Sequence, residues 1–166
     1  MGMIIKDKIQ QLLKGYPTVS DKYNVQGGIL EAGEIEYGTF LTNGTATGYY
    51  VAATAATDKI LGIALAQNVK TPTTYPAGAN YEVKTAAGET VNLLVRGFVA
   101  VEIDPAATAP VEGAPVYLTV VDGAVVTTTA AGTALENAYF TGITEVKAKD
   151  SHNVATKVLA EISFRM

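Results

Sequence analysis

Few residues of this chain could do chemistry, and the histidine is the first to consider. His152 is the single histidine, and it lies in the polar tract 149–153, which is typical of a turn. An imidazole acts as a general base when a neighbouring group orients it, and a solvated turn offers no such group. Cysteine is absent, which excludes thiol nucleophiles, disulfides and thiolate metal ligands.

Two pairs of carboxylates are the remaining candidates for catalysis or metal binding. Glu34 and Glu36 alternate along one predicted strand, and Glu102 and Asp104 do the same on another, so each pair shares a face. Such a pair could work as an acid and a base, or as one corner of a metal site. Charged residues at strand ends are far more common as solvated edges that discourage aggregation. We therefore predict that the chain is not an enzyme and holds no cofactor or metal.

The composition indicates one β-rich domain. The chain has 166 residues, of which 48% are hydrophobic and 17% charged, below the usual share of about a quarter. A sequence rich in Ala, Thr, Val and Gly suits sheets packed on sheets. No run approaches the roughly 20 apolar residues of a membrane span, and the start lacks the order of a signal peptide. We expect synthesis in the cytoplasm and no membrane partner.

Charge divides the chain into a basic leader and an acidic body. Residues 1–22 hold four lysines and two aspartates, and the rest hold eight basic and fourteen acidic residues, for a net charge of −4. Because nucleic-acid backbones are bound by clustered Lys and Arg, the acidic body argues against nucleic acid as the main partner, and we expect none. The basic leader could dock on an acidic protein surface or form a solvated helical face.

The apolar residues of the leader recur at nearly helical spacing. They are Ile4, Ile5, Ile9, Leu12 and Leu13. Gly15 stops this pattern, and Pro17 starts a different one. We predict a short amphipathic helix in an N-terminal arm that covers residues 1–31, followed by a single β domain over residues 32–166.

Almost every later segment has the pattern of a short strand. Asn43-Gly44 and Asp122-Gly123 each indicate a hairpin, because both central residues of a type I′ turn need positive φ. The longest loops, 67–79 and 104–113, carry prolines. Short strands without an internal helix predict an all-β fold, either a compact β-barrel or a β-sandwich of antiparallel strands. The further predicted strands are 48–53, 59–66, 80–85, 90–103, 139–147 and 155–165.

One phrase occurs twice in the sequence. Residues 32–41 place a glycine before a short β-branched and aromatic strand, and Gly62 follows within a later strand. Residues 110–118 repeat this order, with Gly142 downstream. Between the two, residues 86–103 form a turn that runs into one long alternating strand. Glycine in such places suits a bend or a close backbone approach.

The order and spacing of these phrases resemble the capsid cement and decoration proteins of tailed bacteriophages, over about residues 25–165. The resemblance implies a virion structural protein that binds the outer surface of the icosahedral head and stabilises contacts between major capsid subunits. It implies synthesis in the host cytoplasm and a place on the outer capsid surface. It also implies a homo-oligomer on the capsid, with a trimer preferred over a dimer.

The leader and one loop supply the predicted contacts with the major capsid protein. An arm can lay an added strand or a short helix against a neighbouring subunit, and loops at barrel ends commonly carry contacts. The candidate contact residues are Ile4, Ile5, Lys6, Lys8, Ile9, Leu12, Tyr75 and Pro76.

Two other functions stay open. A head fibre or appendage that binds a host or a glycan could stack sugars on tyrosines, although core or interface packing is the commoner use of such rings. Residues 56–60 resemble the Asp-Lys hairpin tip of lipoyl carrier domains, in which Lys59 would carry the cofactor, but Ala56 stands where that family has Glu. The tyrosines are Tyr49, Tyr50, Tyr75, Tyr81 and Tyr139.

Overall fold

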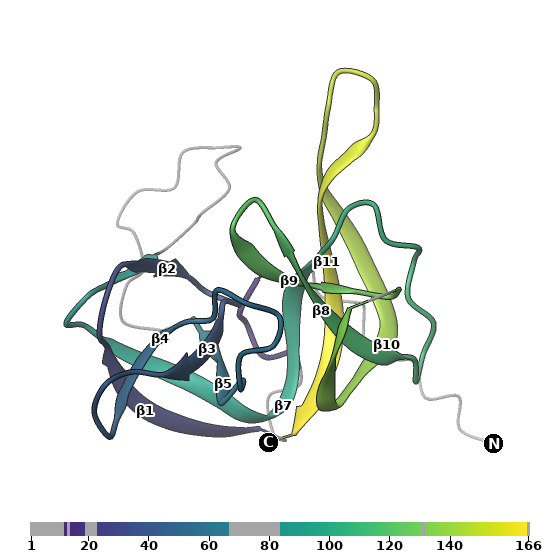
Figure 1. Cartoon of the computed structure of the whole chain (residues 1–166). Helices are drawn as coiled ribbons and strands as arrows, with labels where there is room; N and C mark the ends of the chain where they lie inside the picture. Colours follow the sequence, from purple (N-terminus) through teal and green to yellow (C-terminus); the bar gives the residue numbers. More distant parts are fainter. Residues whose placement is uncertain (1–11, 13, 19–22, 67–83, 131, 166) are drawn as a thin grey trace.

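The computed structural model describes residues 12, 14–18, 23–66, 84–130 and 132–165, which hold eleven strands and no helix (Figure 1). The predicted all-β class is therefore confirmed. The predicted N-terminal helix lies outside the described residues, apart from Leu12. Within the described ranges, no helix is long and apolar enough to cross a membrane. The strands are β1 (Asn24–Leu30), β2 (Glu34–Glu36), β3 (Phe40–Asn43), β4 (Tyr49–Ala52), β5 (Gly62–Leu65), β6 (Lys84–Ala86), β7 (Thr90–Ile103), β8 (Pro115–Val121), β9 (Ala124–Thr128), β10 (Thr133–Lys149) and β11 (Ala155–Arg165).

Nine of these strands form one sheet that closes on itself twice. Their order is β1-β4-β3-β5-β7-β11-β10-β8-β9, and β7 also pairs with β1 and with β9. The first half of β7 thus completes a barrel with β1, β4, β3 and β5. Its second half completes another barrel with β11, β10, β8 and β9 (Figure 1). We call these the first and second barrels; β2 and β6 form a separate two-stranded sheet.

The long strand β7 connects the two barrels because its alternation continues through both. Val91 and Leu93 belong to the buried cluster of the first barrel, whereas Val99 and Val101 belong to the larger cluster that fills the second. Gly97 lies between them at φ 145°, a conformation that side chains disfavour. The predicted range of residues 90–103 matches the observed strand.

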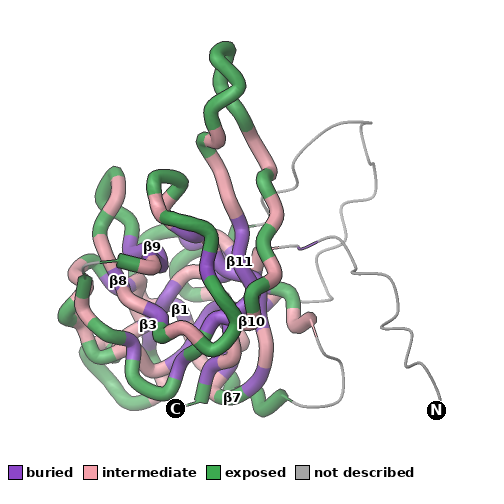
Figure 2. The backbone as a smooth tube through the Cα atoms, turned by 90° about the vertical axis from the view of Figure 1, so that its right-hand side faces the viewer, coloured by how far each residue is buried: buried purple, intermediate pink, exposed green. Residues whose placement is uncertain are grey.

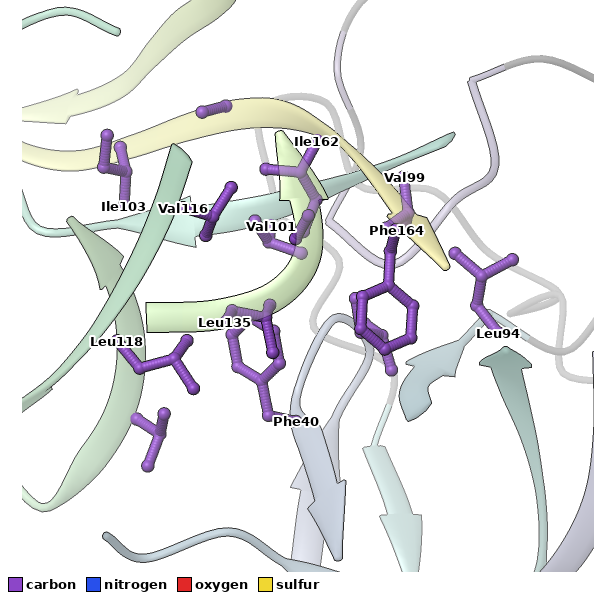
Figure 3. Packing of buried hydrophobic residues seen from close by; sticks show 14 of the residues in the cluster. Phe40, Leu94, Val99, Val101, Ile103, Val116, Leu118, Leu135, Ile162 and Phe164 are labelled. Carbon is purple, nitrogen blue, oxygen red and sulfur yellow. The ribbon is translucent and has the colours of Figure 1, made fainter. Parts of the chain in front are cut away.

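The two barrels pack against each other over one continuous core. Phe40 and Ile63 from the first barrel, with Leu94 from β7, join a cluster that also holds Phe140 and Phe164 of the second barrel (Figure 3). All five side chains are at most 2% exposed. Strands of the first barrel therefore bury both faces, one inside that barrel and one against its neighbour.

Three turns of one kind start the strands β3, β7 and β8. The third residue of each turn is a glycine at positive φ, namely Gly38 at 81°, Gly88 at 84° and Gly113 at 79°. Each glycine donates its N–H to the carbonyl of one residue on a facing segment. The N–H of that same residue donates back to the carbonyl of the residue that follows the glycine. The facing residues are Ala64, Leu30 and Phe140, respectively. This shared turn explains why glycine-centred phrases recur in the sequence.

The later glycines of the repeated phrase are not equivalent in the structure. Ala64 faces the turn with Gly38 in the same way that Phe140 faces the turn with Gly113. Gly62 precedes Ala64 in the chain, whereas Gly142 follows Phe140, so the two glycines are in different positions. The repetition of these two glycines is a likeness of sequence alone.

The two predicted hairpin turns have different outcomes. The type I′ turn at Asp122-Gly123 is confirmed, with φ values of 50° and 79°. The one at Asn43-Gly44 is wrong, because the connection from β3 to β4 extends to a turn with Gly48 at φ 82°. Pairing continues past this dipeptide, because Asn43 pairs with Tyr50 and Gly44 donates its N–H to Tyr49. The Glu31 carboxylate supports the longer connection by accepting the Thr45 N–H at 2.6 Å.

The hairpin of β10 and β11 extends well beyond the second barrel (Figures 1 and 2). Its strands pair with each other as far as Lys149 and Ala155. Figure 2 shows that this end of the hairpin is exposed or half-buried over its whole length. Within the predicted arm, the structure places Asn24–Leu30 in the sheet, and the division into arm and domain stays a prediction.

Candidate functional site

Residues 12 and 14–18, which we call the N-terminal clasp, include a segment that bonds to the backbone of β7 where the two barrels meet. Gly15 donates its N–H to the carbonyl of Ala100 at 2.8 Å, in the second half of β7. The carbonyl of Gly15 accepts the N–H of Ala66 at 2.9 Å, just after β5 of the first barrel. The clasp is therefore hydrogen-bonded to elements of both barrels.

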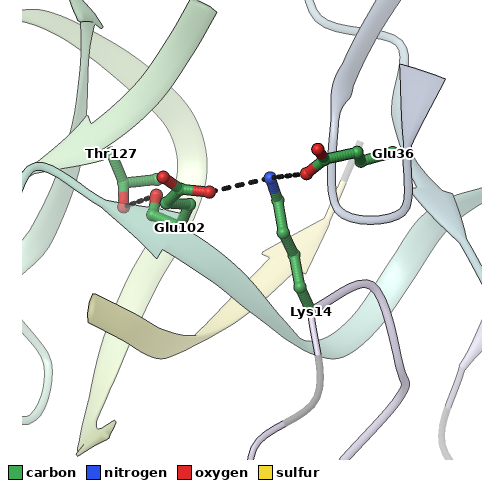
Figure 4. A network of polar contacts seen from close by, with 4 residues as sticks. All are labelled: Lys14, Glu36, Glu102 and Thr127. Carbon is green, nitrogen blue, oxygen red and sulfur yellow. Dashed lines mark hydrogen bonds and ion pairs between the residues drawn. The ribbon is translucent and has the colours of Figure 1, made fainter. Parts of the chain in front are cut away.

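Lys14 is the charged centre of the clasp (Figure 4). Its Nζ lies 2.9 Å from Oε2 of Glu36 on β2 and 2.8 Å from Oε2 of Glu102 on β7. Thr127 donates its hydroxyl to the carbonyl of Glu102 at 3.0 Å, which ties β9 to the same point. Burial lowers the pKa of Lys14, but the hydrogen bonds and charges of Glu102 and Glu36 outweigh it and raise the pKa above its ordinary value.

Two residues of the clasp pack closely against the turn that precedes β3. The Cα of Gly15 leaves no room for a side chain, because an added Cβ would meet Gly38 and Tyr37. The Tyr16 and Tyr37 rings meet edge to face with centroids 6.5 Å apart. The clasp is thus fitted by shape to the turn that precedes β3 of the first barrel.

Leu12 fixes the other end of the clasp on the second barrel. Its side chain is 2% exposed and packs against Ala100 and Leu159, and its N–H donates to Oε2 of Glu145 at 2.7 Å. Oε1 of Glu145 lies 2.7 Å from Nζ of Lys147. Burial raises the pKa of Glu145, but the hydrogen bonds from Lys147 and Leu12 and the Lys147 charge lower it overall. The clasp therefore runs from β7 across β11 to β10.

Of the predicted contact residues, the structure describes Leu12. Its buried side chain attaches the clasp to the second barrel, so this side chain faces the protein itself. The other predicted contacts lie outside the described residues: Ile4, Ile5, Lys6, Lys8, Ile9, Tyr75 and Pro76.

The two predicted carboxylate pairs serve as structural partners. Glu36 and Glu102, one from each pair, share Lys14, whereas Glu34 binds Lys84 at 3.0 Å on the surface. No group of three or more His, Cys, Asp or Glu side chains gathers as a metal site in the described part of the chain. Sequence reasoning missed Lys14, because one lysine among four in the leader carries no signal of its partners.

The histidine and the lipoyl-like segment both lie in turns. The His152 side chain is 85% exposed, and Oδ1 of Asp150 accepts the His152 N–H at 2.8 Å, as in a solvated turn. Asp58 accepts the N–H groups of Ala55 and Thr54 at 2.9 and 2.8 Å, and these bonds lower its pKa. Asp58 therefore shapes the turn that precedes β5, next to Lys59.

Of the tyrosines proposed for sugar stacking, the structure describes three, and one of these is buried. Tyr50 is 6% exposed, and its hydroxyl accepts a hydrogen bond from Gln26 at 2.9 Å. Tyr49 belongs to the first barrel and Tyr139 to the second. Tyr75 and Tyr81 lie outside the described residues.

The most exposed apolar side chains of the described residues lie on the second barrel and its hairpin. Their exposed fractions run from 72% to 45%, in the order Val111, Val154, Tyr139, Val146 and Val120. Exposed apolar side chains are available for contacts with other proteins, although single ones are normal on any surface.

The described polar side chains of this double barrel shape turns and tie segments of the chain together. The chain belongs to the phage structural cement protein family (E217 gp24/Pam3 gp6), whose model matches residues 5–165. The resemblance inferred from the glycine-centred phrases is thereby confirmed.

The fold is also found in a solved phage capsid. A chain in the capsid of Myoviridae Phage XM1 is similar over 99% of this chain and 97% of its own length, with a TM-score of 0.58. The identity is 18%, so this likeness shows the fold alone. No curated protein matches the chain at a significant level.

Proposed function

We propose that the protein binds the outer surface of an icosahedral phage head and stabilises the contacts between major capsid subunits. The observation that carries this proposal is the match to the cement protein family over residues 5–165. A protein that binds only the assembled shell stabilises that shell by mass action, and many weakly bound copies are sufficient. This family is one of structural proteins and is not an enzyme class.

The clasp gives the attachment a mechanical basis. It joins residues 1–11 to both barrels, because Gly15 bonds to Ala66 beside the first barrel, while Lys14 binds Glu102 and Leu12 packs on the second barrel. A load applied to the leader would pass into two barrels at once. The proposed contacts with the major capsid protein are Ile4, Ile5, Lys6, Lys8, Ile9, Tyr75 and Pro76.

Cryo-electron microscopy of undecorated capsids mixed with the purified full chain tests the attachment. We expect density at regular positions on the outer surface of the lattice. Decorated capsids should also release their DNA at a higher temperature than capsids in buffer, by an amount that saturates with occupancy. Equal rupture temperatures for bare and fully decorated capsids would contradict the stabilising role.

The location and oligomeric state belong to the same proposal. We place the protein in the virion, on the outer capsid surface, after synthesis in the host cytoplasm. The homo-oligomer expected from the family resemblance, with a trimer preferred over a dimer, stays a prediction, and the mass of the protein in solution and on the capsid tests it.

A further inference from the structure

The tip of the β10–β11 hairpin is a turn that holds its own shape. Asp150 donates its N–H to the carbonyl of Val154 at 2.8 Å, and its Oδ1 accepts the N–H groups of His152 and Val154 at 2.8 and 2.9 Å. Nζ of Lys149 donates to Oδ1 of Asn153 at 3.0 Å. All these bonds lie within the turn, so the tip can keep its shape while it moves relative to the barrel.

The hairpin has a hinge where it leaves the second barrel. β11 pairs with β7 as far as Val158, which lies opposite Ile103 at the end of β7. Beyond that point, the described backbone pairs within the hairpin alone (Figure 2). Over residues 146–149, β10 has two register shifts against β11, and such irregularities interrupt the ladder and let strands bend. We call residues 146–149 and 155–158 the hairpin hinge.

One ion pair joins this hinge to the barrel. Nζ of Lys147, in the hinge, lies 2.7 Å from Oε1 of Glu145, which pairs with Leu159 where β11 is still bonded to β7. The Lys147 side chain is 13% exposed, and its Nζ is shielded from solvent. Separating a shielded ammonium from its carboxylate is costly, so the pair opposes bending of the hinge.

The N-terminal clasp holds the carboxylate of this pair in place. Oε2 of Glu145 accepts the Leu12 N–H at 2.7 Å, while the Leu12 side chain packs against Ala100 of β7 and Leu159 of β11. The two oxygens of Glu145 are therefore bonded to different segments, one to the clasp and one to the hinge.

We propose that the Glu145–Lys147 pair is a latch that fixes the angle of the hairpin at the end of the second barrel, and that the clasp holds this latch through Leu12. With the latch open, the two register shifts would let the rigid tip take several orientations. Because Leu12 directly follows residues 1–11, the latch also connects the leader with the exposed hairpin. The inference goes beyond the proposed function, since it concerns the free protein and does not depend on capsid binding.

Two spin labels measure the angle of the hairpin. The chain has no cysteine, so labels attach only at Tyr139→Cys on the second barrel and Val154→Cys in the turn, both at exposed side chains. Double electron–electron resonance should give one narrow distribution of label distances. Lys147→Met, added to this protein, should broaden the distribution, because methionine keeps a long apolar stem and loses the charge. Lys149→Met is the matched control, because Lys149 bonds within the turn, and it should leave the distribution narrow.

Two further changes separate the latch from the clasp. Glu145→Gln breaks the ion pair but keeps an acceptor for the Leu12 N–H, and it should broaden the distribution as Lys147→Met does. Removing residues 1–18 should also broaden it, whereas removing residues 1–11 should not. Circular dichroism at the temperature of labelling establishes that each variant is folded.

Three results would overturn the latch. They are a broad distribution before any latch residue is changed, a narrow one in both Lys147→Met and Glu145→Gln, and equal broadening in the Lys149→Met control. A narrow distribution after removal of residues 1–18 would overturn the role of the clasp.

Discussion

The Lys14 side chain joins two elements of the fold, the two-stranded sheet through Glu36 and the second barrel through Glu102. Its ammonium pairs with both carboxylates, and its own side chain is 21% exposed. Replacing it by an apolar residue leaves two half-buried carboxylates facing each other without a cation. The cost of such a change is set by the desolvated charges that lose their partner.

We therefore predict that Lys14→Met lowers the free energy of unfolding by about 1–2 kcal/mol, as measured by urea denaturation near neutral pH. Lys84→Met is the matched control, because Lys84 is 46% exposed in its pair with Glu34 and should cost less than about 1 kcal/mol. Because the pKa of Lys14 is raised, its contribution is present below its unfolded pKa and is lost as pH rises through its folded pKa. The difference between wild type and Lys14→Met should narrow in strongly alkaline solution. Equal losses in the two variants would contradict the central role of Lys14.

Glu145 makes the attachment of Leu12 sensitive to acid. Its pKa is lowered overall, so its stabilising contribution is present above the unfolded pKa and is lost as pH falls through the folded one. We expect the Leu12 amide, corrected for intrinsic exchange, to lose hydrogen-exchange protection over that acidic window. In Glu145→Gln, which keeps an acceptor oxygen and cannot ionise there, protection should vary much less with pH. If the wild type and Glu145→Gln lose protection of the Leu12 amide over the same acidic range, a titrating group other than Glu145 is responsible.

Leu12 was predicted to lie on an apolar face, but its partners in the structure were not predicted. The spacing of apolar residues identified it as part of an apolar face, and it is indeed buried. The pattern does not say what covers that face, and the sequence analysis assigned it to the capsid, whereas the structure shows Ala100 and Leu159.

At the scale of elements, the turns with Gly38 and Gly113 offer a direct comparison. Both glycines have φ near 80°, so alanine at either position costs about 1–2 kcal/mol in backbone strain. A Cβ at position 113 would meet open space, whereas one at position 38 would lie 2.7 Å from Cγ of Lys14 and 3.1 Å from the Gly15 nitrogen. We predict that Gly38→Ala destabilises the protein more than Gly113→Ala in thermal unfolding. An equal loss of stability in the two variants would show that backbone strain alone sets the cost, and that the clasp can move away from a side chain at position 38 without further loss.

Local elements were predictable where a short stretch of sequence determines them. The alternation in β7 and the Asp122-Gly123 turn depend on neighbouring residues, and both predictions match the structure. The Asn43-Gly44 prediction failed because pairing continues past that dipeptide to Tyr49, and Glu31, outside the hairpin, supports the longer connection through Thr45. The preference of Asn-Gly for a type I′ turn is a local one, and contacts made by residues outside the dipeptide can outweigh it.

At the scale of the whole molecule, the sequence predicted a barrel or a sandwich but not two barrels sharing β7. The closures depend on β1 meeting the first half of β7 and β9 meeting its end at Ile103 and Thr127. Alternation marks which residues of a strand are buried, but it does not say which strand edges meet. The same limit applies to the candidate site, since Lys14, Glu36 and Glu102 lie on three segments far apart in the sequence, and no local pattern says that they meet.

Two truncations separate the leader from the clasp. Removing residues 1–11 keeps Leu12, Lys14 and Gly15 in place, so the shortened protein should unfold at nearly the wild-type temperature. Removing residues 1–18 also deletes the Lys14 ion pairs and the Leu12 contacts, and it should lower that temperature by several degrees for a domain of this size. If the leader carries the contacts with the major capsid protein, removing residues 1–11 should weaken co-sedimentation with capsids despite its intact fold. Undiminished co-sedimentation would assign the attachment to another surface of the protein.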